Sequence, residues 1–391
     1  MDIAPPELMK FFNGSPVANI EDWQERSSEI LKYFQNEVYG LPPYLNCRTK
    51  LELVEEGIAR DFINCKREQY QLSIIDGSSE LKLGVLLYKP LKQSVKATFL
   101  TLNFYGNHTI SADPEVWISK SYVRGFKDSV KYLINNRMGE DSRGLSADNY
   151  SIQNIINHGY SILTAFCGDI CPDNSGMHLK EGVFPFFKSK GVDSNEWGAI
   201  SAWAWGLSQI IGQVGSMDGL LPDKIILFGH SRLGKAALWA AAQDKRVFGV
   251  ISNQSGCMGA KLNSRKLGET FALIRKNFPH WFCKKFNDYE EENIKVDQHC
   301  LLALIAPRPI YVTSAENDPG TDPCGQFMAL QMSQPAYDIY GVQHTELVSH
   351  PPLDDPIIDW LAYHFRQGQH SVNEYDWEQF IKWADKITLR P

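Results

Sequence analysis

A serine in the segment KIILFGHSRLGKAALWAAA, residues 224–242, carries the clearest chemical signal in the chain. A short apolar run, Ile225 to Phe228, precedes Gly229-His230-Ser231, and an alanine-rich stretch starts near Gly234. The apolar run predicts a buried strand, and the alanine-rich stretch predicts a helix. A serine at a tight turn between a strand and a helix has its hydroxyl exposed, where it can act as a nucleophile.

This turn resembles the nucleophile elbow of α/β-hydrolases, although its second glycine comes one residue late, which gives G-x-S-x-x-G. A serine hydroxyl needs a base that a third group orients. In this fold the acid and then the histidine follow the serine in the sequence. Four late histidines are therefore candidates for the base: His344, His350, His364 and His370.

His370 is the preferred base because it follows a turn that contains a glycine, RQGQH, where a loop can bring it over the serine. His364 lies in a stretch with a helical pattern, IIDWLAYHF, which favours a core or surface role. His344 and His350 lie in a predicted loop and stay open as alternatives.

Asp318 is the preferred third member, because it stands just past the predicted strand PIYVTSA. Asp322 and Glu316 are neighbouring alternatives. The backbone N–H of Arg232 is expected to face the oxyanion, and its guanidinium to add a second donor, to bind substrate or to form an exposed salt bridge. A further backbone donor is expected from the loop Tyr105–Gly106–Asn107.

The elements around these residues alternate between strands and helices, which predicts an α/β protein with a doubly wound, mostly parallel sheet and helices on both faces. Strands are predicted at 49–56, 68–75, 81–88, 95–108, 158–169, 225–228, 247–256, 303–320 and 336–341. Helices are predicted at 21–39, 148–157 and 194–214 and after the serine. Residues 170–193 are expected to form a surface loop, and 257–300 a mostly helical insertion. We expect a single domain over 1–391, with an N-terminal helix and strands in 1–90.

The composition is that of an ordinary globular protein and sets limits on its partners. A net charge of −7 argues against a nucleic-acid partner. No apolar stretch reaches the roughly 18 residues that a membrane span needs, and the first residues, MDIAPPELMKFF, do not resemble a secretory signal. The eight cysteines have no metal-binding spacing, so we expect mainly free thiols and neither a metal nor a cofactor.

Several longer strings resemble the bacterial branch of the glucuronoyl esterases, a family of microbial carbohydrate esterases. They are GHSRLGKAALWAAAQDKRVFGVISNQSG, FPHWF, VDQHCLLALIAPRPIYV and RQGQH before Asp376-Trp377, and the resemblance runs from about residue 20 to the C-terminus. It implies an α/β-hydrolase fold and metal-free cleavage of the ester between a lignin alcohol and a (4-O-methyl)glucuronic acid carboxyl group on xylan. It implies a glucuronoxylan-like substrate. Family members are usually secreted or periplasmic.

The resemblance also implies roles for individual residues. Ser231 resembles the nucleophile, Arg232 the oxyanion-hole arginine and His370 the base. Three further residues are expected to bind the substrate: Lys235 at its sugar hydroxyls, Glu269 in RKLGE at the uronate ring, and Trp281 in FPHWF.

Two positions depart from the family pattern. Many members carry the triad glutamate where this chain has Gln254, whereas some bacterial members place an acid where Asp318 stands. A tryptophan expected two residues after that acid is replaced by Gly320. Three hypotheses follow: a glucuronoyl esterase with Asp318 as its acid, an esterase for another small ester such as an acetylated sugar, and a hydrolase-fold binding protein without turnover.

Overall fold

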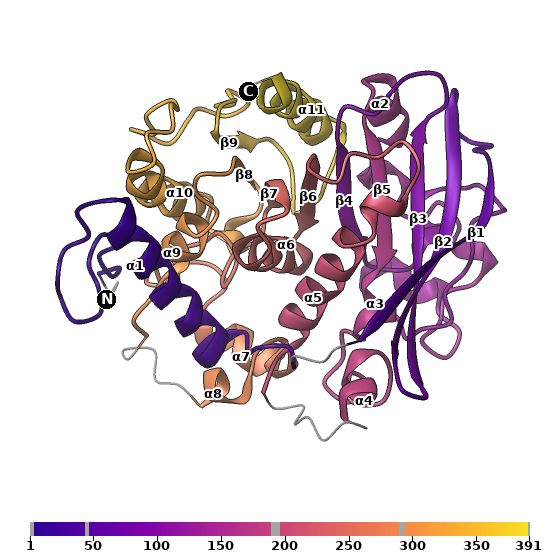
Figure 1. Ribbon diagram of the computed structural model, residues 1–391, viewed down its shortest axis with the longest axis horizontal. Helices are drawn as coiled ribbons and strands as arrows, with labels where there is room; N and C mark the ends of the chain where they lie inside the picture. The colour runs from indigo at the N-terminus through magenta and orange to yellow at the C-terminus, as the bar shows by residue number, and fades with distance from the viewer. Residues whose placement is uncertain (1–3, 44–46, 189–195, 289–293, 390–391) are drawn as a thin grey trace.

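A nine-stranded sheet forms the centre of the computed structural model, which describes residues 4–43, 47–188, 196–288 and 294–389 (Figure 1). The strands lie in the order β1-β2-β3-β5-β4-β6-β7-β8-β9. Their bounds are β1 (Arg48–Ile58), β2 (Cys65–Asp76), β3 (Ser79–Pro90), β4 (Thr98–Asn103), β5 (Ser161–Phe166), β6 (Ile225–His230), β7 (Val247–Asn253), β8 (Ile310–Ala315) and β9 (Leu361–Arg366).

The sheet has an antiparallel part and a parallel part. Strands β1, β2 and β3 pair in antiparallel fashion, and β3 joins β5 in the same way. From β5 through β4, β6, β7 and β8 to β9, all neighbours are parallel. The predicted mostly parallel α/β-hydrolase sheet is therefore confirmed. Because the parallel strands all point the same way, the loops at their carboxyl ends meet at one edge of the sheet.

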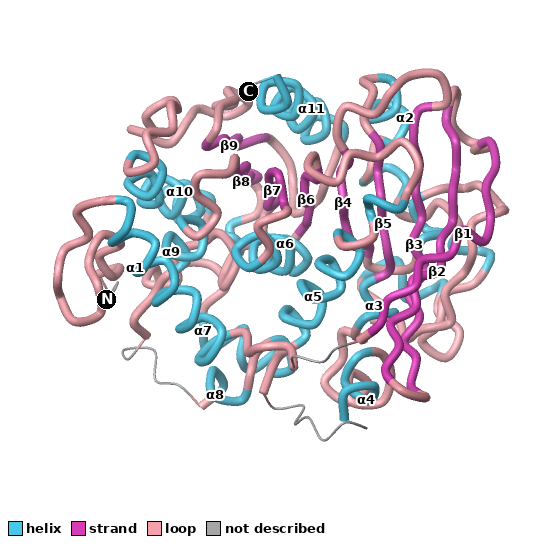
Figure 2. The backbone as a smooth tube through the Cα atoms, in the orientation of Figure 1, coloured by secondary structure: helices cyan, strands magenta, loops and turns pink. Residues whose placement is uncertain are grey.

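Helices cover both faces of this sheet (Figure 2). Their bounds are α1 (Ile20–Tyr33), α2 (Ile152–Asn157), α3 (Cys167–Ile170), α4 (Val183–Lys188), α5 (Ala199–Ile211), α6 (Arg232–Gln243), α7 (Phe271–Asn277), α8 (Lys284–Asn287), α9 (Gln298–Ala303), α10 (Pro323–Asp338) and α11 (Glu374–Leu389). Short helical turns include η1 (Phe34–Val38), η6 (Val214–Ser216), η7 (Pro279–Trp281) and η9 (Pro319–Thr321).

Successive side chains of the central strands pack into two separate cores, as the two-residue period of a strand requires. On β6, Ile225 and Leu227 join the core beneath α5, α6, α9 and α10. Ile226 and Phe228 point the other way, into the core beneath α2 and α11. Both faces of β6 are therefore buried, which explains why its sequence is a continuous apolar run.

Two predicted elements are wrong. Residues 336–341 are not a strand, because Ala336 and Tyr337 form the buried last turn of α10. The stretch IIDWLAYHF does not form a helix, because its second half is the buried strand β9, paired in parallel with β8. Short apolar runs do not distinguish a buried strand from a buried helical turn, and that ambiguity caused both errors.

The two irregular segments also differ in part from expectation. The segment 170–193 contains the short helix α4, and its last residues, 189–193, lie outside the described residues. The insertion 257–300 contains α7, η7, α8 and the start of α9, joined by loops, so its described part is less helical than predicted. All eight cysteines are free thiols. None of the helices in the described ranges is long and apolar enough to cross a membrane.

Candidate active site

Ser231 occupies a strained turn between β6 and α6. Its backbone angles are φ 55° and ψ −127°, a conformation that costs energy for any residue other than glycine. Its N–H donates to the carbonyl of Asn253 at the end of β7, with an N···O distance of 2.9 Å. The hydroxyl therefore stands at the carboxyl edge of the parallel strands, directly before the first turn of α6.

Two glycines permit this turn, and their contacts explain the spacing G-x-S-x-x-G. A Cβ atom on Gly229 would lie 2.2 Å from the carbonyl oxygen of Leu233. A Cβ atom on Gly234 would lie 2.9 Å from the carbonyl oxygen of Gly229 and 3.0 Å from Ser255 Cβ. The strand and the helix approach most closely between positions 229 and 233–234, so the second glycine is required at 234, whereas Leu233 is tolerated and buried.

His370 lies next to this turn and is paired with Asp318. Its Nδ1 is 2.7 Å from Asp318 Oδ2, and its ring centroid is 4.5 Å from that of His230. Asp318 also accepts a hydrogen bond from Thr321 Oγ1 at 2.9 Å. Burial would raise the pKa of Asp318, but the hydrogen bond and charge of His370 outweigh burial and lower it. An ionised acceptor fixes the proton of His370 on Nδ1 and leaves Nε2 able to take another.

The two other acids considered are occupied elsewhere or exposed. Asp322 Oδ2 lies 2.8 Å from Arg265 Nε, and Asp322 Oδ1 accepts the N–H of Gly325, which caps α10. Glu316 is exposed at the end of β8. The geometry thus separates Asp318 from both alternatives.

The other late histidines have partners away from Ser231. His344 Nε2 is 3.0 Å from Asp338, and His350 Nε2 is 3.1 Å from the Tyr363 hydroxyl. His364 is fully buried and lies between Asp376 and the Tyr311 hydroxyl, at 2.8 and 2.9 Å. His364 is therefore a core histidine, although on a strand and not on the predicted helix.

Gln254 anchors the loop that carries His370. Its Oε1 accepts the backbone N–H of Ser371 at 3.1 Å, and its side chain is fully buried. Within the described parts of the chain, its Nε2 has no hydrogen-bond partner. Gln254 thus contacts the residue after His370 without supplying a negative charge, and the carboxylate beside the imidazole comes from Asp318.

Arg232, the residue after the serine, is clamped between a carboxylate and an aromatic ring. Its Nε forms an ion pair with Asp173 Oδ2 at 2.8 Å, although among the described residues this N–H donates no hydrogen bond. Its Cζ lies 4.5 Å from the centroid of Phe104. The side chain is 18% exposed, so the guanidinium is neither buried nor an ordinary surface group. Asp173 was not predicted, because it lies in the segment 170–193 and its partners are far away in sequence.

The three residues expected to bind substrate lie together beside α6. Lys235 Nζ donates to the carbonyl of Ser255 at 2.7 Å and lies 3.6 Å from Glu269 Oε2. The same Nζ lies 5.5 Å from the centroid of Trp281. The Glu269 side chain is the more exposed of this pair, at 26% against 4% for Lys235.

Trp281 does not present an open ring face. It is 4% exposed, its Nε1 donates to Asp173 Oδ1 at 2.7 Å, and one face is stacked on Phe278 with the ring centroids 3.9 Å apart. A direct stacking role for Trp281 on a sugar ring therefore has no support here, because Phe278 already covers one face. Trp281 instead packs between Asp173, to which it donates a hydrogen bond, and the Lys235 side chain.

The loop Tyr105–Asn107 differs from expectation at its glycine. The N–H of Gly106 donates to Asn103 Oδ1 at 2.8 Å, so this donor is already used and does not supply an oxyanion contact. The carbonyl of Gly320 accepts the N–H of Glu269 at 2.7 Å. Of the atoms in the described residues, a Cβ atom on Gly320 would meet only Asp318 Oδ1, at 3.7 Å, so this position is open.

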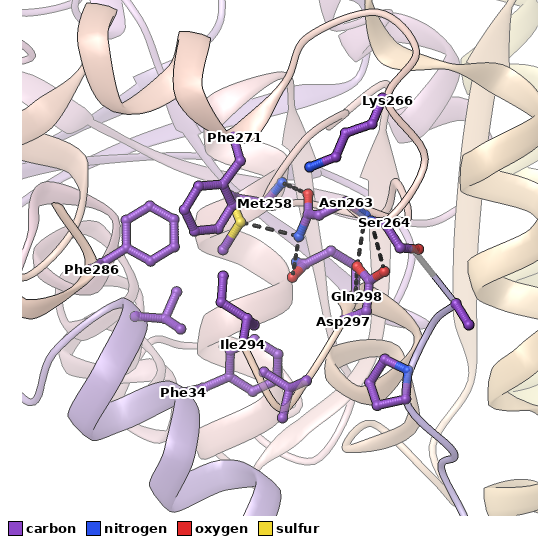
Figure 3. Close-up of a pocket in the computed structure, with 14 residues that line it drawn as sticks. Phe34, Met258, Asn263, Ser264, Lys266, Phe271, Phe286, Ile294, Asp297 and Gln298 are labelled. Carbon is purple, nitrogen blue, oxygen red and sulfur yellow. Dashed lines mark hydrogen bonds between the residues drawn. The ribbon is translucent and has the colours of Figure 1, made fainter. Parts of the chain in front are cut away.

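A small cavity of about 50 Å³ lies away from Ser231, beneath the insertion (Figure 3). Phe34, Phe271 and Phe286 line its apolar end, and Asn263 and Gln298 lie at its polar end. Asn263 Nδ2 donates to Gln298 Oε1 at 3.2 Å, so the two polar lining residues are hydrogen-bonded to each other.

Over the described stretches of the chain, no cluster of three or more His, Cys, Asp or Glu side chains is placed to hold a metal ion.

Comparisons with known proteins identify relatives of the whole chain. A family model for fungal glucuronyl esterases matches residues 149–341. The carbohydrate esterase MZ0003 from an unknown prokaryotic organism is 35% identical over 387 residues, which cover 97% of this chain and 88% of that protein. A glucuronoyl esterase from Solibacter usitatus superposes with a TM-score of 0.90 at 34% identity over 99% of this chain and 98% of that chain. A promiscuous CE15 esterase from the marine bacterial metagenome gives 0.88 at 34% identity, over 98% and 96%.

Proposed function

This chain belongs to the glucuronoyl esterase family of carboxylic ester hydrolases, and we propose that it hydrolyses esters between the carboxyl group of a glucuronic acid and an alcohol, with Ser231 as nucleophile. The observation that carries the proposal is the 2.7 Å contact between His370 Nδ1 and Asp318 Oδ2 beside the strained turn of Ser231. A strained serine next to an oriented imidazole is the arrangement that acyl transfer through a serine requires.

In the proposed first step, Ser231 Oγ attacks the ester carbonyl while His370 Nε2 takes the hydroxyl proton. The carboxylate of Asp318 stabilises the imidazolium that forms, and the pKa lowering of Asp318 supports its staying ionised. His370 then returns the proton to the departing alcohol, which leaves an acyl-enzyme. Water, activated by the same imidazole, attacks that ester and releases the uronic acid.

Among the described residues the Ser231 hydroxyl makes no hydrogen bond to His370, whose Nδ1 is bonded to Asp318. Hydrogen bonds between nucleophile and base are often long in ligand-free enzymes and tighten when substrate binds. We therefore expect a substrate carbonyl to bring the two together and to complete the hydrogen-bond chain from Ser231 through His370 to Asp318.

The negative charge on the carbonyl oxygen would be stabilised by Arg232. The first N–H groups of a helix have no acceptor within the helix, and the backbone N–H of Arg232 is the first of α6. Its guanidinium, held over Phe104, adds a positive charge at the same end of the helix. Preorganised donors of this kind supply a large share of the rate enhancement in acyl transfer.

The sugar would be recognised by the polar groups one helical turn beyond Ser231. Lys235 and Glu269 lie 3.6 Å apart and offer a donor and an acceptor for sugar hydroxyls. Glu269 also binds the Asp318 loop through Gly320. A glucuronoxylan chain fits this proposal as the polymeric substrate, and we propose that residues 1–391 act as one domain because a single sheet joins its N-terminal and C-terminal strands.

The proposal is tested by comparing two esters of similar size, benzyl glucuronate and an acetylated sugar. We expect kcat/KM to be at least about tenfold higher for the glucuronate ester, because polar groups built for a substrate's hydroxyls discriminate by a few kcal/mol. Ser231→Ala gives the background rate. Faster turnover of the acetyl ester would contradict the uronate assignment.

The second candidate, an esterase for an acetylated sugar, is favoured by one observation. The open space at Gly320 enlarges the site beside Asp318, and a relative of similar length is described as promiscuous. In that case the same Ser231 chemistry would act on an acetyl carbonyl, and the paired assay above decides between the two substrates.

A further inference from the structure

One buried carboxylate, Asp173, lies between Arg232 and η7 and has no role in the proposed chemistry. Its side chain is 3% exposed, and it lies in the loop after α3. Four side chains from distant parts of the sequence place nitrogen atoms beside it: Arg124, Arg232, His280 and Trp281.

The two oxygens of Asp173 have different partners. Oδ1 accepts from His280 Nε2 at 2.9 Å and from Trp281 Nε1 at 2.7 Å, both in η7. Oδ2 lies 2.8 Å from Arg232 Nε and 3.3 Å from Arg124 Nη1. Oδ1 therefore binds η7, which contains Trp281, and Oδ2 is paired with Arg232, the residue after the proposed nucleophile.

The contact with Nε determines which atoms of Arg232 are left for a ligand. Nε lies 2.8 Å from Asp173 Oδ2 as an ion pair, although among the described residues its N–H is not aligned to donate a hydrogen bond. Because Cζ also lies over the Phe104 ring, the two Nη nitrogens are the part of the group not engaged by these contacts. A guanidinium on a long flexible side chain loses much rotamer freedom when it is fixed. Holding it before substrate binds removes that cost from the catalytic step.

Asp173 carries the charge that this role requires. Burial would raise the pKa of Asp173, but the charge of Arg232 and the bonds from His280 and Trp281 outweigh burial and lower the pKa well below its usual range. The carboxylate therefore stays ionised throughout the neutral range, and its attraction for Arg232 does not vary there.

We propose that Asp173 is a positioning residue that orients the Arg232 guanidinium toward the oxyanion and links it to η7, which contains Trp281. The inference rests on the proposed function, since it assigns to Arg232 the oxyanion role given above. Asp173 itself touches no reacting atom, so its effect on the rate must pass entirely through Arg232.

A double-mutant cycle with Asp173→Asn and Arg232→Ala tests this route. An asparagine can keep its oxygen toward His280 and Trp281 only by turning its NH₂ group toward Arg232 and Arg124, which places donors against donors. We expect Asp173→Asn to lower kcat by about 10- to 100-fold with KM changed less than about threefold, below the loss for a deleted oxyanion donor. In the Arg232→Ala background, adding Asp173→Asn should lower kcat by less than about twofold.

A matched control is Asp244→Asn at the far end of α6. Asp244 has a side chain 8% exposed and pairs with Arg246 at 2.6 Å, so it is also a shielded carboxylate with an arginine partner. We expect its kcat to match that of the unmodified protein. Should Asp173→Asn fail to fold, Asp173→Glu keeps the charge but displaces it by one methylene, and the same cycle with that variant decides the matter.

A loss of kcat for Asp173→Asn that persists undiminished in the Arg232→Ala background would overturn the inference, because Asp173 would then act by another route. So would a kcat equal to that of the unmodified protein. These results are distinct from failure of the proposed function, which would appear as ester hydrolysis that survives Ser231→Ala.

Discussion

His370 Nδ1 and Asp318 Oδ2 lie 2.7 Å apart although the two residues follow different strands of the sheet. Asp318 follows β8 and His370 follows β9, and these strands are parallel neighbours, so their carboxyl ends adjoin. Ser231 follows β6, and His230 brings that strand end to within 4.5 Å of the His370 ring, measured between ring centroids. Three loops at one edge of the sheet therefore supply the proposed nucleophile, base and acid.

Replacing Asp318 by asparagine should remove the charge that stabilises the imidazolium and permit the wrong tautomer of His370. We expect kcat to fall by about 10⁴-fold, the loss seen for the equivalent change in a serine protease. Steady-state kinetics on a glucuronate ester measures this effect, with KM expected to change little.

Asp322→Asn is the matched control, since Asp322 is buried four residues later but pairs with Arg265. Asparagine caps a helix about as well as aspartate, so this variant should keep the cap on α10, lose the ion pair with Arg265 and leave kcat within a few-fold of the unmodified protein. Should Asp322→Asn be the inactive variant and Asp318→Asn the active one, the assignment of the acid would be wrong.

Gln254→Ala should loosen the loop that carries His370. The change removes the acceptor for the Ser371 N–H, a hydrogen bond of about 1 kcal/mol. We expect kcat to fall by roughly five- to tenfold. Gln254→Glu retains an oxygen at the same place and should stay within about threefold of the unmodified rate. Equal losses in the two variants would show that the hydrogen bond to Ser371 is not what matters.

Gly229→Ala should disrupt the turn of Ser231, because the new Cβ would lie 2.2 Å from the Leu233 carbonyl oxygen. Backbone must move to relieve such a contact, so we expect a loss of about 3 kcal/mol in the free energy of unfolding and little remaining activity. Gly215→Ala is the control, since its Cβ would meet only Pro222, at 3.9 Å. Urea unfolding and ester hydrolysis of both variants check the prediction; a fully active Gly229→Ala would contradict it.

His230 should make the protein less stable as the pH falls below 6.5. Burial, and then the charge of His370, lower the pKa of His230 from 6.5 to about 3. Between these two pH values the unfolded chain binds a proton that the folded protein excludes. The free energy of unfolding therefore decreases as the pH is lowered through this range, and His230 has no effect on it above pH 6.5.

Comparing urea unfolding at pH 7.5 and pH 5 isolates this contribution. His230→Gln, which does not titrate but can still donate to Asn253, should lose about 1–2 kcal/mol less than the unmodified protein between the two pH values. Identical losses in both proteins would show that His230 titrates normally in the folded state.

The turn of Ser231 was predictable because every signal for it is local. The apolar run of β6, the glycines at 229 and 234 and the alanines of α6 lie within one short segment, and strand period and steric limits act over that range. The order of serine, acid and histidine then limited the base and the acid to a few positions, from which the geometry favours His370 and Asp318.

Features that depend on distant contacts could not be predicted. Asp173 is significant only through Arg232, His280 and Trp281, which the fold brings to it from far along the chain. The burial of Trp281 against Phe278 is likewise a result of packing, so the residue expected to bind substrate lacks the open ring face that stacking on a sugar needs. Strand β9 was missed because its apolar run has no period that separates strand from helix.

Covalent labelling with a fluorophosphonate tests the central claim, that Ser231 is an activated nucleophile, most directly. Mass spectrometry should find one label per chain on the tryptic peptide 225–232, none on that peptide in Ser231→Ala, and labelling at least about 100-fold slower in His370→Ala. Asp244→Asn should label at the unmodified rate. Ester hydrolysis without any labelling of Ser231, or equal labelling of the Ser231→Ala protein, would contradict the account.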